Sequence, residues 1–215
     1  MRVIRITAIA SATLASILVS LAACAAPLTV VQVGAPDVNC VFNASCKLTV
    51  TDTVDNLPPV PGYTGKAMLQ SRTAVAAATG VPGAGTTVYI YRVDLTGATA
   101  ATDQMCVSSV AVNFGPIAKL PYSGAGKPKA DVFVVTSGGL GTVGLKSADQ
   151  TGSTVTFQIS TASFPAPGDP FPPVCAGQTT FFFGLASTKA PVASKAQVHM
   201  GIYGIKSVGA RTPTY

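Results

Sequence analysis

The sequence predicts an all-β protein: an antiparallel β-sandwich with proline- and glycine-rich loops or, alternatively, a β-barrel. Three observations lead to this fold class. Short segments alternate between apolar and polar residues, the pattern of strands with one buried face. The 21 glycines and 16 prolines gather between these segments, where they interrupt regular structure. Glu, a strong helix former, is absent from the sequence, and all eight acidic residues are Asp.

The first half of the chain supplies several expected strands. An apolar run at residues 28–33 and the segment 47–54 come first. Residues 66–78 fit either a strand or a short helix. The segment 86–95 is rich in β-branched and aromatic residues, which favour strands. Residues 107–114 alternate clearly, and we expect one face of this strand to be buried.

The second half continues the same pattern. Residues 132–136 form a short apolar run, and residues 153–160 alternate between apolar and polar side chains. Further strands are expected from Phe181 onward and over 195–205. The segment 164–178 contains five prolines and is expected to be a surface loop, because proline cannot donate to a strand ladder.

Residues 1–23 have the order of an export signal. Arg2 and Arg5 precede an uncharged, apolar segment that ends in small residues. Such a segment is a signal peptide rather than part of the fold. We therefore expect a signal peptide over 1–23 and one β-sandwich domain over 24–215, a length that such domains commonly reach.

The signal ends in Leu21-Ala22-Ala23-Cys24, which resembles the lipobox of bacterial lipoproteins. The resemblance covers only this segment and implies that Cys24 is acylated and becomes the new N-terminus. Ala25 stands where Asp would retain a lipoprotein in the inner membrane. The resemblance therefore implies an outer-membrane or cell-surface lipoprotein in a Gram-negative source. An ordinary cleaved signal, giving a periplasmic or secreted soluble protein, is the alternative.

Four cysteines follow Cys24, and an even number in an exported chain suggests two disulfides. Three connectivities are possible. The short, turn-like spacer between Cys40 and Cys46 favours their pairing, which leaves Cys106 with Cys175. Four reduced core cysteines are the alternative.

The formal net charge is +6, and the basic residues are scattered. Their tightest cluster is Lys127 and Lys129 in a glycine-rich loop. Nucleic-acid binding requires a concentrated basic surface, so we expect no nucleic-acid partner. The expected partners are the membrane, through the anchor at Cys24, and an envelope protein or glycan. A mildly positive surface favours anionic lipid or glycan.

Few residues could carry catalysis. His199 is the only histidine and is expected to lie on the exposed face of a strand, with Gln197 and Tyr203. Residues 139–144 match the dinucleotide-binding pattern G-x-G-x-x-G, but the segment after them alternates like a strand, whereas that site needs a helix. A glycine-rich connection is therefore expected, with no cofactor and no metal site.

Tyr89 and Tyr91 are the candidate ligand contacts. They share one strand face and could stack on a sugar, or they could pack beside a neighbouring strand. The sequence thus favours an exported, non-catalytic structural or binding module. A secreted hydrolase using Asp and His199, and a carrier of small apolar ligands, are the alternatives.

Overall fold

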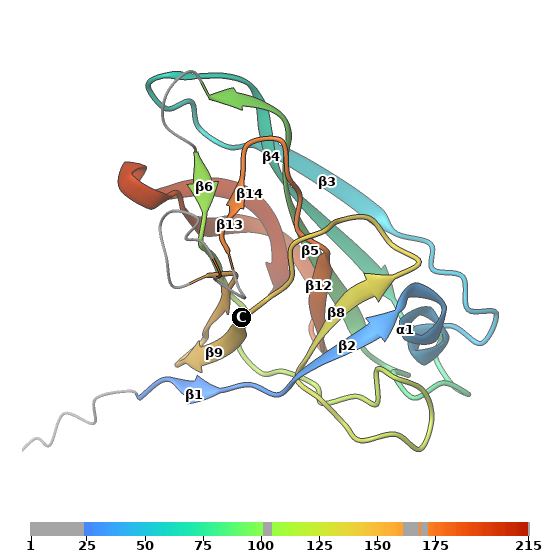
Figure 1. The fold of residues 1–215 in the computed structure, drawn as a ribbon. Helices are drawn as coiled ribbons and strands as arrows, with labels where there is room; N and C mark the ends of the chain where they lie inside the picture. The colour runs from blue at the N-terminus through green and yellow to red at the C-terminus, as the bar shows by residue number, and fades with distance from the viewer. Residues whose placement is uncertain (1–23, 101–104, 161–167, 169–171, 215) are drawn as a thin grey trace, which may run out of the picture.

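The structure, a computed structural model, describes residues 24–100, 105–160, 168 and 172–214. The signal peptide expected at 1–23 falls outside these residues, as do residues 164–167 and 169–171 of the proline-rich segment. The end of that segment differs from the expected surface loop, because Val174–Cys175 form a short buried strand. Within the described residues the chain forms fourteen strands, one α-helix and one short 3₁₀ helix (Figure 1). The predicted all-β class is confirmed: the strands form two stacked sheets, which do not close into a barrel in the part described.

The first sheet has six strands, and every neighbouring pair is antiparallel. Its order is β1 (Ala26–Pro27), β9 (Ser147–Thr151), β10 (Thr154–Gln158), β7 (Ser109–Asn113), β13 (Pro191–His199) and β14 (Ile205–Pro213).

The second sheet also has six strands. Its order is β2 (Val30–Gly34), β8 (Val132–Ser137), β12 (Phe182–Ser187), β5 (Thr87–Ala100), β4 (Tyr63–Val75) and β3 (Thr51–Asn56). One departure from the expected antiparallel arrangement is the β2–β8 pair, which is parallel. A small separate pair joins β6 (Cys106–Val107) to β11 (Val174–Cys175).

Several local expectations change. The ambiguous segment 66–78 lies largely in strand β4. The strand expected over 195–205 is interrupted after β13 by the 3₁₀ helix Gly201–Tyr203, and β14 then runs back along β13. Gly201 and Gly204 adopt positive φ there, which lets the chain reverse.

The α-helix α1 (Ala35–Phe42) is not anticipated by the strand pattern. It starts with a proline in its first turn, where the missing N–H costs nothing, and with Asp37 near its positive end. Val38, Val41 and Phe42 form its buried face. At eight residues it is too short to be stable alone, so packing on the second sheet stabilises it. In the described part of the chain, no helix is long and apolar enough to cross a membrane.

Aromatic side chains fill the space between the sheets. Tyr89 meets Phe114 edge-on, with ring centroids 5.1 Å apart. Phe157 of the first sheet lies 4.8 Å from Phe183 of the second. Such contacts add to the free energy gained by burying the rings.

The outer face of the second sheet carries another apolar cluster. It is covered by α1 and by the β7–β8 loop, which we define as residues 114–131. Tyr122 of this loop lies between Phe42 of the helix and Phe133 of β8, with centroid distances of 6.2 and 4.8 Å. The second sheet is therefore buried on both faces over much of its area.

The two sheets meet at two corners. At one corner the chain passes from β1 in the first sheet to β2 in the second through Leu28 and Thr29 alone. At another, the backbone N–H of Gly209 donates to Asp55, and that of Arg211 donates to Ser71 Oγ at 3.0 Å. The side chains of Asp55 and Ser71 thus accept hydrogen bonds from backbone N–H groups on the unpaired side of the edge strand β14.

The close packing of β12 can be tested at Gly184. A Cβ there would lie 2.3 Å from the carbonyl oxygen of Tyr89 and 2.7 Å from the Phe133 ring. We expect Gly184→Ala to lower the free energy of unfolding by about 1–3 kcal/mol, because such overpacking forces the sheet apart. Gly144→Ala is the control, since its Cβ would meet only Phe181 at 4.0 Å. Equal urea midpoints for the two variants would contradict this packing.

Candidate functional site

Both predicted disulfides are confirmed. Cys40 of α1 is joined to Cys46, six residues later, and Cys106 is joined to Cys175, 69 residues later. The second bridge links directly opposed residues of β6 and β11. Disulfides form and persist in oxidising surroundings, so the pair suggests a non-reducing environment.

Cys24 is the one described cysteine outside a disulfide, and it is exposed. Only Ala25 separates it from β1. The structure thus places the candidate lipidation site directly at the edge of the first sheet.

The candidate ligand contacts Tyr89 and Tyr91 are not on the surface, so that prediction is wrong. Both residues are 0% exposed in the inter-sheet core. Their hydroxyls donate to the carbonyl oxygens of Lys189 and Arg211, at 2.8 and 2.7 Å. Burial raises the pKa of Tyr89 above its usual value. The rings pack against neighbouring strands, as the alternative expected, and offer no face to a sugar.

His199 is half-buried at the end of β13, rather than exposed as expected. Its Nδ1 lies 3.1 Å from Oγ of Ser108, a residue that is only 3% exposed. A shallow groove of about 200 Å³ beside the ring is lined by Ser109, Ala111, Thr156, Gln197 and Ile205, with no carboxylate among them. The described residues therefore give His199 no acidic partner in this groove, and Ser108 is too buried to attack a substrate.

The glycine-rich segment 139–144 is a connection between strands, as predicted. Strand β9, not a helix, follows it. A Cβ at Gly141 would lie 2.2 Å from the carbonyl oxygen of Thr180, and this residue has a φ of +112°. Glycine is required there for close backbone approach, not for a pyrophosphate.

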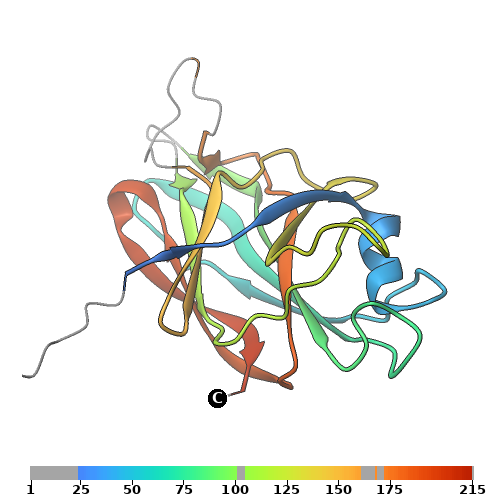
Figure 2. The same ribbon diagram turned by 90° about the horizontal axis from the view of Figure 1, so that it is seen from below.

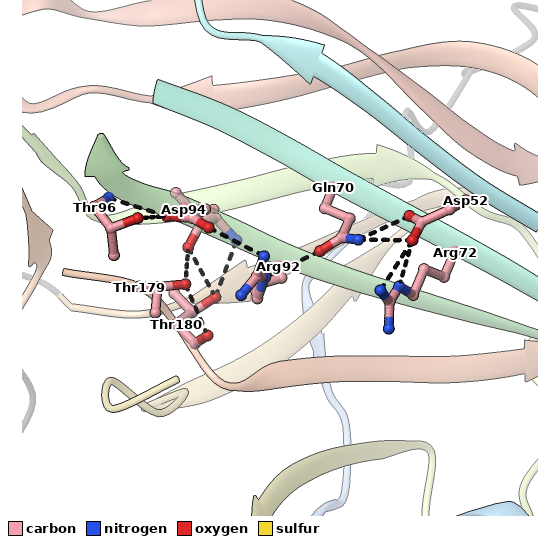
Figure 3. A network of polar contacts seen from close by, with 9 residues as sticks. Asp52, Gln70, Arg72, Arg92, Asp94, Thr96, Thr179 and Thr180 are labelled. Atoms are coloured by element: carbon pink, nitrogen blue, oxygen red, sulfur yellow. Dashed lines mark hydrogen bonds and ion pairs between the residues drawn. The ribbon is translucent and has the colours of Figure 1, made fainter. Parts of the chain in front are cut away.

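A polar network crosses the outer face of strands β3, β4 and β5 (Figure 3). Gln70, 6% exposed, lies at its centre. It donates through Nε2 to both carboxylate oxygens of Asp52, at 2.8 Å, and accepts from Nε of Arg92 at 3.0 Å. Arg72 pairs with Asp52 at 2.9 Å, and Arg92 pairs with Asp94 at 3.0 Å.

The network is electrically neutral, because the carboxylates of Asp52 and Asp94 pair with the guanidinium groups of Arg72 and Arg92. Asp94 also accepts hydrogen bonds from the backbone N–H and the hydroxyl of Thr96, at 3.0 and 2.6 Å. The guanidinium groups of Arg72 and Arg92 both lie over the Phe182 ring, at 4.6 and 5.0 Å from its centroid. These groups bond to one another, so the arrangement suits a structural role better than proton transfer.

Sequence reasoning missed this network. The expected strands 47–54 and 86–95 contain Asp52 and Asp94, which lie within β3 and β5, but the local pattern does not show that these strands bring the two residues into one network. The register of β3, β4 and β5 brings together residues about 20 positions apart. Polar residues two apart on each strand are the signal that could have revealed a polar face.

An apolar groove of about 330 Å³ lies beside the network. It is formed between α1, the segment around Leu48 and the glycine-rich connection at Leu140, with Phe182 and Arg72 in its wall. This groove is a surface feature. The space between the sheets, where a carrier would enclose a ligand, is occupied by aromatic side chains.

Among the described residues, no group of three or more His, Cys or Asp side chains is placed to hold a metal ion. The acidic residues that the structure describes are largely engaged by the chain itself. Asp131, for example, accepts from the backbone N–H of Thr29 at 2.9 Å and pairs with Lys119 at 3.2 Å.

Removing the bridging amide should show that the network is structural. We expect Gln70→Met to lower the free energy of unfolding by about 1–3 kcal/mol, because Arg92 loses a buried acceptor and Asp52 a donor. The control Gln197→Met, at an exposed position of β13, should change it by less than about 0.5 kcal/mol. Urea denaturation measures both, and a Gln70→Met variant as stable as the control would refute the assignment.

The Ser108–His199 pair is suited to a double-mutant cycle. We expect His199→Ala alone to destabilise the fold, because it leaves the buried Ser108 hydroxyl without its partner. In the Ser108→Ala/His199→Ala variant the loss should be smaller than the sum of the single losses by about 0.5 kcal/mol or more. Additive losses would mean that the bond contributes nothing to stability.

Comparison with known proteins identifies no relative of this chain. No family model matches the chain, and neither a curated protein nor a solved structure matches it.

Proposed function

We propose that this protein is an exported, lipid-anchored, non-catalytic structural or binding module of the bacterial cell envelope. The observation that carries the proposal is the position of Cys24. It follows the lipobox-like segment, is exposed, lacks a disulfide partner and precedes the first strand by two residues. Acylation at this position would attach the folded sandwich directly to a membrane.

The edge position of β1 is compatible with such an anchor. Two residues of extended chain span at most about 7 Å, so the tether between Cys24 and Ala26 is short. Residues 24–27 are all exposed, and β1 has a partner on one side only. An acylated Cys24 could therefore enter a bilayer without unpairing the sheet.

The disulfides support export. Both bridges would be kept reduced in most bacterial cytosols, whereas they persist in the periplasm or at the cell surface. The Cys106–Cys175 bridge closes a long loop, and such closures stabilise a fold by about 2–4 kcal/mol.

The arrangement of polar groups supports a non-catalytic role. General acid–base chemistry needs a positioned group that can exchange a proton with a substrate. The described carboxylates Asp52, Asp94 and Asp131 are paired with basic residues. Around His199 the groove offers hydroxyl, amide and apolar groups instead of a carboxylate.

The anchor is tested by replacing its thiol. We expect wild-type protein from the membrane fraction to carry a diacylated or triacylated Cys24 by intact mass, and to partition into the detergent phase. Cys24→Ser should abolish both properties, because a hydroxyl cannot replace the acylated thiol. Ala25→Ser, a change of similar size at the next residue, should retain both. A mature wild-type chain that begins after Cys24 would overturn the proposal.

A further inference from the structure

Two lysines of the β7–β8 loop carry charge that the chain does not neutralise. Lys127 and Lys129 are exposed, and neither forms an ion pair with a described residue. The third lysine of the loop, Lys119, differs, because it pairs with the buried Asp131. Lys127 and Lys129 therefore present two free positive charges, separated by one proline.

The fold holds these charges in place. The Tyr122 side chain is 0% exposed under the loop. Leu120 and Ala130 exchange backbone hydrogen bonds across the base of the loop, at 2.9 and 3.1 Å. Gly124 and Gly126 turn the chain at positive φ. The lysines thus lie on a loop whose base is fixed, so little ordering is needed before they bind.

The same loop lies beside the N-terminal segment. The backbone N–H groups of Asp131 and Val132 donate to the carbonyl oxygen of Thr29, both at 3.0 Å. Seen from below, the β1–β2 segment crosses the molecule, and the β7–β8 loop lies next to it (Figure 2). The two segments form one face of the protein, which we call the β1–β2 face.

Cys24 lies at the start of this segment. Thr29 is five positions farther along the chain, a distance of at most about 18 Å for extended chain. An anchor at Cys24 would bring one edge of the β1–β2 face to the bilayer, while the fixed loop lies farther along the same face. One acidic residue, Asp149, lies near Cys24, because it is paired with Pro27 across the β1–β9 ladder. Its side chain is half-buried and accepts a hydrogen bond from the Ser147 hydroxyl at 3.4 Å.

We propose that the β1–β2 face lies on the membrane that carries the anchor, with Lys127 and Lys129 at the headgroups of anionic lipids. This inference rests on the lipid anchor proposed above. The anchor alone would fix one edge of the face and leave the sandwich free to tilt. The lysine pair would fix the tilt, because unpaired lysines close to an anionic surface are attracted to it at short range.

Lysine acetylation of the wild-type protein tests this orientation. The mature protein, purified from the membrane fraction, is placed in vesicles of equimolar phosphatidylcholine and phosphatidylglycerol, or of phosphatidylcholine alone. We expect a water-soluble acetylating reagent to modify Lys127 and Lys129 about fivefold more slowly on the anionic vesicles. Lys66 and Lys195, exposed on β4 and β13, are the internal controls and should react equally on both.

A tryptophan reporter gives a second measurement, because the sequence contains no Trp. Ala125→Trp places one at the tip of the β7–β8 loop, and Ile202→Trp places one in the exposed 3₁₀ helix as a control. We expect brominated lipids in anionic vesicles to quench only the loop reporter. Lys127→Gln/Lys129→Gln should reduce that quenching, whereas Lys66→Gln/Lys195→Gln, with the same loss of charge, should not.

The outcomes separate the two proposals. Acylated Cys24 together with protected loop lysines supports both. Acylated Cys24 with equal acetylation of all four lysines overturns the orientation and leaves the anchor intact. A mature chain without lipid on Cys24 overturns the anchor, and the orientation falls with it.

Discussion

The second sheet has apolar residues on both of its faces, and most of the structure follows from the need to cover them. On strand β5, Tyr89 and Tyr91 point between the sheets, whereas Val88 and Ile90 point to the outer side. The first sheet covers the inner face. The outer face requires additional cover because exposed apolar area costs free energy. Helix α1 and the β7–β8 loop supply that cover.

The polar network begins where this cover ends. Toward the other end of β5, Arg92 and Asp94 take the outward positions that Val88 and Ile90 occupy earlier. Phe182 marks the boundary, because its ring packs in the apolar cluster and also lies beneath two guanidinium groups. The outer face of the sheet is thus stabilised in two ways. Its apolar residues are covered by other parts of the chain, and its polar side chains form hydrogen bonds and ion pairs with one another.

Both-sided burial also explains which features the sequence could predict. Strands such as β7 and β10, with one wet face, show a clear alternation and were placed well. On β5 the alternation is weak, because neighbouring residues are apolar on both sides. The sequence therefore identified the strand but left open whether Tyr89 and Tyr91 contact a ligand or pack beside a neighbouring strand, and the second alternative is the one observed. The disulfides were predictable because a spacer of five residues strongly limits the partners of Cys40.

Other features depend on register and could not be read from local pattern. The bonds of Gln70 to Asp52 and Arg92 require three strands to align, and α1 is too short to show a strong period. The 3₁₀ turn after β13 was missed for a related reason: its residues continue the apolar alternation, while its glycines permit the reversal. In each case a tertiary contact decides between conformations that the local sequence allows.

The two sheets protect their edges in different ways, and one of these edges carries the proposed anchor. At the β14 edge, Asp55 and Ser71 bond outward-facing backbone donors that could otherwise pair with another chain. At the other corner, the β1–β2 segment forms the edge strand of each sheet, because β1 pairs with β9 and β2 pairs with β8. A lipoprotein could use residues after its acylated cysteine as a flexible tether, but here those residues are strand. Because the corner needs this segment, attachment at Cys24 would hold the sandwich close to the bilayer, and its surface charges would then decide which way it faces.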